Sequence, residues 1–213
     1  MTVIPKGRFI TVEGIEGTGK STNLHFLASL IEAAGYDVLQ TREPGGSPMA
    51  EQIRQLILDH DQEPMPPITE LLLFFAARSL HLQNKILPAL KEGKWVLCDR
   101  FADASHAYQG VGRKLGVKRV ERLKEWVLDG LEPDLTVLLD APAEIGMSRA
   151  AARGEGDRMD NETLVFYQRV RGAYLELADA HPERFVVIDA SLSLDRVQEA
   201  ISQAMAHFLN NQN

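Results

Sequence analysis

Short apolar runs alternate along the chain with stretches in which apolar residues recur at helical spacing. The runs are rich in branched side chains and therefore predict β-strands. Five strands are expected, over residues 8–13, 36–41, 94–99, 135–140 and 185–189. The third and fourth are apolar almost throughout, which is typical of parallel strands covered on both faces. The pattern predicts an α/β fold with a parallel sheet flanked by helices.

Helices are predicted between these strands. Leu24, Leu27, Ala28 and Ile31 lie at helical spacing, and Gly35 follows as a helix stop. Further helices are expected over residues 49–57, 69–90, 117–129, 144–153, 162–180 and 194–209. Pro88 should kink or restart the helix of residues 69–90, because proline lacks the backbone donor that a helix needs. Residues 60–67 and 154–160 are predicted to be mobile connections, since prolines or glycines and charges fill them.

A glycine-rich segment follows the first predicted strand and opens the first predicted helix: Gly14-Ile15-Glu16-Gly17-Thr18-Gly19-Lys20-Ser21. Strand, loop and helix in this order are the context of the phosphate-binding P-loop. Its backbone N–H groups can surround phosphate oxygens, Lys20 can reach the β- and γ-phosphates, and the Ser21 hydroxyl can meet Mg²⁺. The alternative, a glycine-rich turn with a surface lysine, is disfavoured by the flanking strand and helix.

Composition narrows the partners and the compartment. The 213 residues, 45% of them hydrophobic, can bury the core of one domain over residues 1–213. The net charge of −7 disfavours nucleic acid, whose phosphates bind basic surfaces. The single cysteine, Cys98, falls in an apolar strand, which predicts a packing role and a reducing cytoplasm. The sequence shows neither a long apolar run nor a signal peptide, so no membrane segment is expected.

The six histidines show no ligand-like spacing. A structural metal is therefore not expected, and the histidines are interpreted as ordinary surface or partly buried groups.

Charged residues end the second and third predicted strands. Ligands of open parallel sheets bind outside the carboxyl ends of the strands, so Asp99 could hold Mg²⁺ and Arg100 could bind a phosphate. A surface salt bridge is the alternative for this pair. The second strand is followed by Pro44-Gly45-Gly46, which either fixes Arg42 and Glu43 at the same rim or simply makes a turn.

A third basic group lies near residues 149–160. Arg149 and Arg153 are four residues apart and share a helix face, and Arg158 follows a glycine-rich connection. This segment could close as a lid and bring arginines to the charge that develops during phosphoryl transfer. It could instead be an exposed basic helix end that complements the helix dipole.

Together, four segments closely resemble bacterial thymidylate kinases: residues 13–22, Thr41-Arg42-Glu43-Pro44-Gly45-Gly46, Asp99-Arg100-Phe101, and Ser105-His106-Ala107-Tyr108-Gln109-Gly110. The resemblance covers nearly the whole chain in order, and the second and fourth segments are much more selective than the P-loop. It implies the P-loop nucleoside monophosphate kinase fold, a five-stranded parallel sheet with a short lid, assembled as a homodimer. The implied reaction is phosphorylation of dTMP to dTDP with ATP and Mg²⁺.

The resemblance also implies roles for residues on the acceptor side. Phe74 would stack on thymine and Arg78 would donate to its carbonyl edge, whereas periodicity alone favours a core position for Phe74. The two residues are four apart and share a helix face, so Phe75 would point into the core. Glu16 would meet the deoxyribose 3′-hydroxyl, since a carboxylate facing polyphosphate would be repelled. The other residues expected around dTMP are Arg42, Glu43, Arg54, Arg100, Ser105, Tyr108 and Gln109.

On the donor side, the resemblance implies that residues Gly14, Ile15, Glu16, Gly17, Thr18, Gly19, Lys20, Ser21 and Thr22 bind ATP, with Ser21 and Asp99 at the metal. The P-loop holds no arginine, unlike that of the eukaryotic branch of the family. The catalytic arginine should then come from the lid, as Arg153 or Arg158, beside Lys20 and Arg100, and Arg149 would pack on adenine. Phe101 stands where many relatives have tyrosine.

Other function classes share part of this pattern. A kinase for another nucleoside monophosphate or a small metabolite would use the same P-loop, as would a noncatalytic ATP-binding regulator. A GTPase switch normally carries Asp-x-x-Gly and Asn-Lys-x-Asp elements. Neither is present, because no aspartate has a glycine three places on and Asn84-Lys85-Ile86-Leu87 lacks the final acid.

Overall fold

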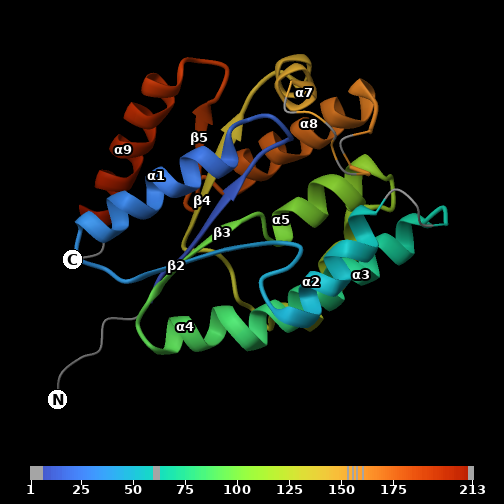
Figure 1. Ribbon diagram of the computed structural model, residues 1–213, viewed down its shortest axis with the longest axis horizontal. Helices are drawn as coiled ribbons and strands as arrows, with labels where there is room; N and C mark the ends of the chain where they lie inside the picture. Colours follow the sequence, from blue (N-terminus) through green and yellow to red (C-terminus); the bar gives the residue numbers. More distant parts are fainter. Residues whose placement is uncertain are drawn as a thin grey trace.

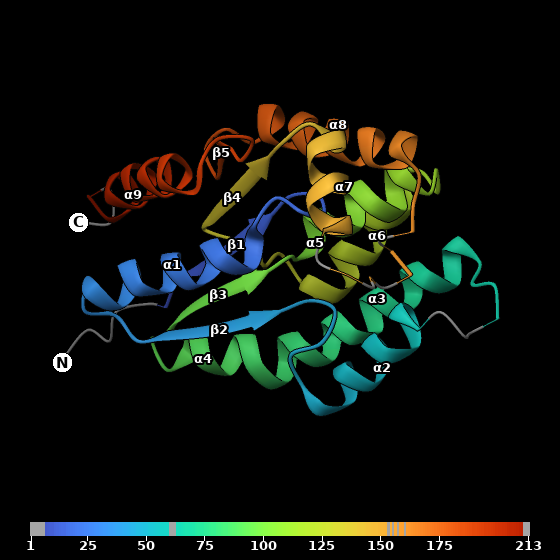
Figure 2. The same cartoon turned by 45° about the horizontal axis from the view of Figure 1, so that its top comes forward.

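Five strands form one sheet in the order β2-β3-β1-β4-β5, and each neighbouring pair is parallel. The computed structural model describes residues 7–59, 63–152, 154, 156, 158–159 and 161–210. The strands are β1 (Phe9–Glu13), β2 (Val38–Arg42), β3 (Trp95–Asp99), β4 (Leu135–Asp140) and β5 (Phe185–Asp189). Their arrows point toward the same side of the molecule in Figure 2, so their carboxyl ends share one edge. The predicted parallel α/β sheet is confirmed.

The first and last residues of the strands agree with the sequence pattern to within one residue, except at the edge strand β2. β2 begins at Val38 rather than at Tyr36 and extends to Arg42. The Tyr36 ring instead stacks on Trp95, with 4.6 Å between ring centroids. Tyr36, which the apolar pattern assigned to the strand, therefore lies outside it and packs against Trp95 through its ring.

Most helical elements follow the alternation expected from the sequence, but residues 102–112 are helical although they were not among the predicted helices. The helical elements are α1 (Lys20–Ala33), α2 (Pro48–Leu58), α3 (Pro67–His81), α4 (Leu87–Lys91), α5 (Ala102–Ser105), α6 (Val117–Leu128), α7 (Ala143–Ala151), α8 (Leu164–Ala180) and α9 (Leu194–Asn210), with π-helical segments η1 (Leu82–Ile86) and η2 (His106–Gly112). None of the helices within the described residues combines the length and apolar character needed to cross a membrane.

Helices cover both faces of the sheet. On one face α1 and α9 lie side by side and pack on alternate strand residues, among them Ile10 and Val137 (Figure 1). The residues of opposite parity, such as Phe9 and Leu138, face η1, α4 and α8 on the other side. Because both faces are covered, the central strands are apolar throughout and leave their polar residues for the strand ends.

The predicted long helix of residues 69–90 is divided. α3 ends at His81, η1 follows, and α4 begins at Leu87 with Pro88 in its first turn. The Leu87 N–H reaches back five residues to the Leu82 carbonyl. Since Pro88 has no N–H and tolerates only the start of a helix, the wider π turn accommodates the restart that the sequence predicted.

Two buried side chains, Cys98 and His81, can be compared with the burial expected from the sequence. Cys98 is fully buried in β3, as expected for a packing residue. The expectation that all histidines are surface or partly buried is wrong for His81, which is 0% exposed. Its Nε2 lies 2.7 Å from Thr41 Oγ1 and its Nδ1 lies 3.1 Å from Glu43 Oε1. Polar partners supplied by β2 and the loop after it make this burial possible.

Candidate active site

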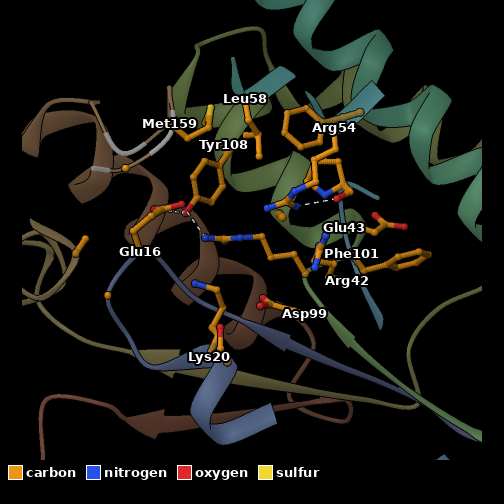
Figure 3. A pocket seen from close by; sticks show the side chains of 18 of the residues that line it. Glu16, Lys20, Arg42, Glu43, Arg54, Leu58, Asp99, Phe101, Tyr108 and Met159 are labelled. Carbon is orange, nitrogen blue, oxygen red and sulfur yellow. Dashed lines mark hydrogen bonds and ion pairs between the residues drawn. The ribbon is translucent and has the colours of Figure 1, made fainter. Parts of the chain in front are cut away.

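A cavity of about 670 Å³ opens at the carboxyl ends of the strands. Figure 3 shows Lys20 and Asp99 on the side nearest the strand ends, and Leu58 and Met159 at the opposite margin. The predicted site residues that line it are Glu16, Gly17, Gly19, Lys20, Ser21, Thr22, Arg42, Glu43, Arg54, Phe74, Arg78, Asp99, Arg100, Ser105, Tyr108, Gln109 and Arg149. Segments distant in sequence therefore meet where an open parallel sheet binds its ligands.

The P-loop connects β1 to α1 and folds back on its own lysine. Lys20 Nζ donates to the carbonyl oxygens of Gly14 and Ile15, at 3.2 and 2.8 Å. Thr18 is buried and its hydroxyl donates to the Ile15 carbonyl at 2.9 Å. Gly14, Ile15 and Thr18 thus shape the loop from behind rather than line the cavity. Burial, and then the nearby charge of Arg100, lower the pKa of Lys20 to about 8.

The backbone of the P-loop packs directly against the backbone of α7. A Cβ atom on Gly17 would stand 2.0 Å from the Gly146 carbonyl oxygen, and one on Gly146 would stand 2.6 Å from the Glu16 carbonyl oxygen. Real side chains do not tolerate such contacts, so both positions require glycine. Sequence reasoning missed Gly146, since a single helical glycine carries no sign of a distant partner.

Arg100 takes an uncommon backbone conformation that directs its side chain to the P-loop. Its φ is 68°, in the left-handed region, and its N–H donates to the Val12 carbonyl at 3.0 Å. The guanidinium donates to the Gly14 carbonyl at 2.7 Å and to Glu16 Oε1 at 2.8 Å. It also lies over the Tyr108 ring, 4.8 Å from the centroid. Left-handed conformations at larger residues persist only when surrounding contacts fix them, as β1 and the P-loop do here.

Glu16 lies between two donors at the cavity wall. Besides the Arg100 contact, its Oε2 accepts a hydrogen bond from the Tyr108 hydroxyl at 2.6 Å (Figure 3). Arginine and tyrosine thus hold an acidic P-loop residue in place. A carboxylate held in this way can accept a hydrogen bond from a hydroxyl group. It also partly neutralises the positive charge of Arg100.

Beneath Arg100 lies a buried carboxylate whose role sequence reasoning missed. Glu13 ends β1, is 0% exposed, and accepts hydrogen bonds of 2.7 Å from the Phe101 N–H and the Tyr174 hydroxyl. Burial, and then the charge of Asp103, raise the pKa of Glu13 to about 7, against the opposing effect of Arg100. Glu13 therefore fixes the turn that carries Arg100.

Asp99 and Ser21 both line the cavity. Asp99 Oδ1 is buried and accepts no hydrogen bond within the described residues. A buried carboxylate oxygen without a partner is costly unless a cation or water meets it. The described residues hold no cluster of three or more acidic, histidine or cysteine ligands. This set fits Mg²⁺, which takes few protein ligands and keeps water and substrate phosphates in its shell.

Helix α3 and the π-helical segment η2 both contribute side chains to the cavity wall. Phe74 lines the cavity, while Phe75 is 3% exposed and packs in a core cluster with Leu71 and Val120. Phe74 therefore lies at the cavity, as the resemblance implies, and not in the core, as periodicity alone favoured.

Arg78 is the largest fully buried side chain of this region, 1% exposed. Its Nε donates to Glu43 Oε2 at 2.7 Å, and its two terminal nitrogens donate to Ser105 Oγ and the Phe101 carbonyl, both at 3.0 Å. Since the other Glu43 oxygen faces His81, the carboxylate of Glu43 supports Arg78 and does not turn toward the cavity centre. The charge of Arg78 is thereby paired in a buried setting.

Two further arginines line the cavity, Arg42 at the end of β2 and Arg54 on α2. Arg42 is exposed and forms an ion pair with Glu51 at 3.0 Å, and Glu51 also accepts the Gly46 N–H at 2.8 Å. Arg54 Nη1 donates to the Pro44 carbonyl at 2.8 Å. The loop after β2 therefore forms part of the cavity wall and is more than a turn.

The predicted lid arginines have different surroundings. Arg149 lines the cavity and donates to the carbonyls of Ala190 and Ser191, at 2.6 and 3.2 Å. Arg158 does not belong to the lining of the cavity as the described residues define it; its guanidinium donates to Glu70 Oε2 and to the Ile57 carbonyl, at 2.7 and 2.8 Å. Arg153 lies outside the described residues.

Glu70 is a further polar residue that sequence reasoning missed. It is 1% exposed and accepts hydrogen bonds from Gln109, Arg113 and Arg158. A signal was present, since Glu70 lies one helical turn before Phe74 and therefore shares its face. Tyr174, by contrast, lies among apolar residues of α8 and gave no signal.

Comparison with known proteins agrees with this geometry. The family model of thymidylate kinase matches residues 12–201. The thymidylate kinase of Alkalilimnicola ehrlichii is 50% identical over 202 residues, which cover 94% of this chain and 93% of the relative. Thymidylate kinases of Pseudomonas putida strain GB-1 and Hahella chejuensis are 52% and 51% identical, covering 92% and 94% of this chain and 93% and 97% of the relatives. A P-loop facing a second cationic site, and similarity over nearly the whole length, establish that the chain belongs to the thymidylate kinase family.

Proposed function

We propose that this protein transfers the γ-phosphoryl group of ATP to the 5′-phosphate of dTMP, giving dTDP and ADP. One observation carries the proposal: Lys20 and Arg100, cations from separate elements, line the same cavity. Lys20 belongs to the phosphate-binding loop, whereas Arg100 follows β3 and contacts Glu16 and the Tyr108 ring. Two anionic tails can therefore meet end to end, each with its own cation.

The chemistry needs positioning more than proton transfer. The attacking group is a phosphate oxygen that is already anionic near neutral pH, so no general base is required. The γ-phosphoryl oxygens carry charge in the transition state, which Lys20 and Arg100 can stabilise. In the structure both side chains donate to P-loop carbonyls, and substrate phosphates would replace these weaker acceptors.

Mg²⁺ would be held by Ser21 and Asp99, together with phosphate oxygens and water. When bound there, the cation would supply positive charge that neutralises part of the phosphate charge. Asp99 Oδ1, which is buried and accepts no hydrogen bond from the part of the chain that the structure describes, supports this assignment.

The acceptor assignment draws on the side chains opposite the P-loop. Phe74 offers a flat ring for stacking on the base, and Arg78 and Gln109 offer polar groups to its edge. Arg54, Arg42 and Arg100 would contact the monophosphate, while Glu16 would accept the sugar hydroxyl beside the Tyr108 ring. A wrong base would leave buried polar groups unpaired, which is the strongest form of selection available to such a site.

We further propose that residues 149–160 act as the lid of a single domain. Arg149, Ala150, Gly154, Gly156 and Met159 all line the cavity, which supports a covering role. Arg149 would pack on adenine, because two carbonyls hold its planar guanidinium. The Glu70 and Ile57 contacts of Arg158 favour Arg153 as the catalytic lid arginine.

A coupled assay of ADP release tests the proposal. ATP and Mg²⁺ are supplied with dTMP, dUMP, dGMP, dCMP or AMP in turn, and dTMP should give the highest kcat/KM. Lys20→Ala should abolish turnover while circular dichroism shows an intact fold. Undiminished turnover in that variant would contradict the assignment, and preference for another acceptor would identify a different nucleoside monophosphate kinase. Tight ATP binding without product from any acceptor would indicate a regulator.

The protein is proposed to work as a cytoplasmic homodimer. Ile68 and Leu72 lie one turn apart on α3, 43% and 51% exposed, and Trp126 on the adjoining α6 is 82% exposed. Large exposed apolar side chains on packed helices are typical of protein interfaces. Sedimentation should give a dimer that Trp126→Asp weakens, and a monomer in the unmodified protein would contradict the assembly. Cys98 is buried and forms no disulfide, which suits a reducing compartment.

A further inference from the structure

We propose that Glu70 is a positioning residue that sets the base preference of the acceptor site by fixing the orientation of the Gln109 amide. The inference rests on the proposed function, since it concerns how a pyrimidine nucleoside monophosphate is read. Glu70 lies on α3 and Gln109 on η2, and both side chains are 1% exposed.

The Glu70 carboxylate is surrounded by donors. Its Oε1 accepts from Gln109 Nε2 at 2.9 Å and from Arg113 Nε at 3.1 Å. Its Oε2 accepts from Arg113 Nη2 at 3.2 Å and from Arg158 Nη2 at 2.7 Å. Four hydrogen bonds fill the acceptor sites of a carboxylate, and the partners carry two positive charges.

This setting keeps Glu70 ionised although it is buried. Burial opposes ionisation, but the hydrogen bonds and charge of Arg113, with Gln109 and Arg158, outweigh it and lower the pKa of Glu70. An ionised carboxylate has no hydrogen to donate. Glu70 can therefore meet the Gln109 amide only through the amide nitrogen.

The orientation of Gln109 follows from this constraint. The two ends of a glutamine amide have nearly the same shape, so packing alone selects neither. With the nitrogen end of the amide bound to Glu70 through one N–H, the opposite, carbonyl end is the one that Gln109 can turn to the cavity it lines. Glu70 thus makes Gln109 a hydrogen-bond acceptor toward the substrate.

The neighbouring Arg78 completes a donor–acceptor pattern. Guanidinium has five N–H groups, and three of those of Arg78 are bound to Glu43, Ser105 and the Phe101 carbonyl. The cavity therefore presents donors from Arg78 and an acceptor from Gln109. Thymine and uracil match this pattern, with a carbonyl beside the N3–H donor. Cytosine has an amino group beside an unprotonated N3, which places donors against donors and acceptors against acceptors.

The test compares dUMP with dCMP as acceptors, because neither base has a methyl group and they differ only at this edge. Glu70→Gln nearly preserves shape but can donate as well as accept, so the Gln109 amide is free to turn over. The ratio of kcat/KM for dUMP to that for dCMP should fall about tenfold or more relative to wild type. Gln109→Met, which removes the amide and leaves Glu70 paired with both arginines, should lower the ratio as well.

Glu162→Gln is the matched control, since Glu162 pairs with Arg113 but makes no hydrogen bond to Gln109 in the described structure. It should leave the ratio within about threefold of wild type. An unchanged ratio in Glu70→Gln or in Gln109→Met would overturn the inference, as would an equal fall in Glu162→Gln. If the wild type phosphorylates dTMP, these results refute only the role of Glu70. A wild type inactive on every pyrimidine acceptor would refute both proposals.

Discussion

The free-energy cost of ionising a buried carboxylate next to the active site can be measured at Glu13. Its carboxylate is fully buried, faces Asp103, Arg100 and Tyr174, and has a pKa raised by burial from its ordinary 4.5 to about 7. We expect Glu13→Gln to remove this titration. The amide oxygen can still accept the Phe101 N–H, and the amide nitrogen can donate to the Tyr174 hydroxyl, so the variant should fold.

The sign follows from proton binding. Between about pH 4.5 and pH 7 the native protein holds a proton on Glu13 that the unfolded chain has lost. Stability is therefore greatest below the lower value and falls as the pH rises through the upper one. At about 1.36 kcal/mol for each pKa unit, the ionised carboxylate costs the native state about 3 kcal/mol above pH 7. Glutamine carries no charge and avoids this cost.

Urea unfolding of both proteins from about pH 5 to about pH 8 measures the effect. The free energy of unfolding of Glu13→Gln, relative to wild type, should rise by about 2 to 3 kcal/mol across this range. The comparison cancels groups that titrate alike in both proteins. Glu176→Gln on the exposed face of α8 removes the same charge and should give a nearly constant difference. A constant difference for Glu13→Gln as well would refute the reasoning.

Two further pairs of substitutions separate function from packing. Phe74→Ala should raise the KM for dTMP by roughly 5- to 150-fold, the equivalent of about 1 to 3 kcal/mol of base stacking, whereas Phe75→Ala should mainly lower the melting temperature because Phe75 is in the core. The reverse outcome would reject the stacking role. Gly146→Ala should weaken ATP binding in a titration, because its Cβ would press on the Glu16 carbonyl, and should destabilise the fold by about 1 to 3 kcal/mol. Gly172→Ala, with open space around it in α8, should leave ATP affinity unchanged and raise stability slightly; equal effects at both glycines would exclude a specific contact.

The pattern of apolar and polar residues predicted most of the strands and helices, because burial on both faces and helical spacing leave a signal in consecutive residues. The apolar runs at β3 and β4 marked buried parallel strands, and the segment ending in Lys20 marked the P-loop in its proper context. His81 and Tyr36 departed from the prediction for nonlocal reasons. His81 is buried because β2 and the following loop supply polar partners, and Tyr36 leaves its strand to stack on Trp95.

The sequence by itself determined the order of the elements, the phosphate loop and the residues that resemble those of the family, because spacing along the chain is enough to specify them. Tertiary structure alone decided how the charges pair. It placed Glu43 behind Arg78, and Arg158 on Glu70 rather than over the cavity, and it brought Gly146 against the P-loop. Which donor meets which acceptor depends on distances between elements far apart in the chain, and no local pattern contains those distances.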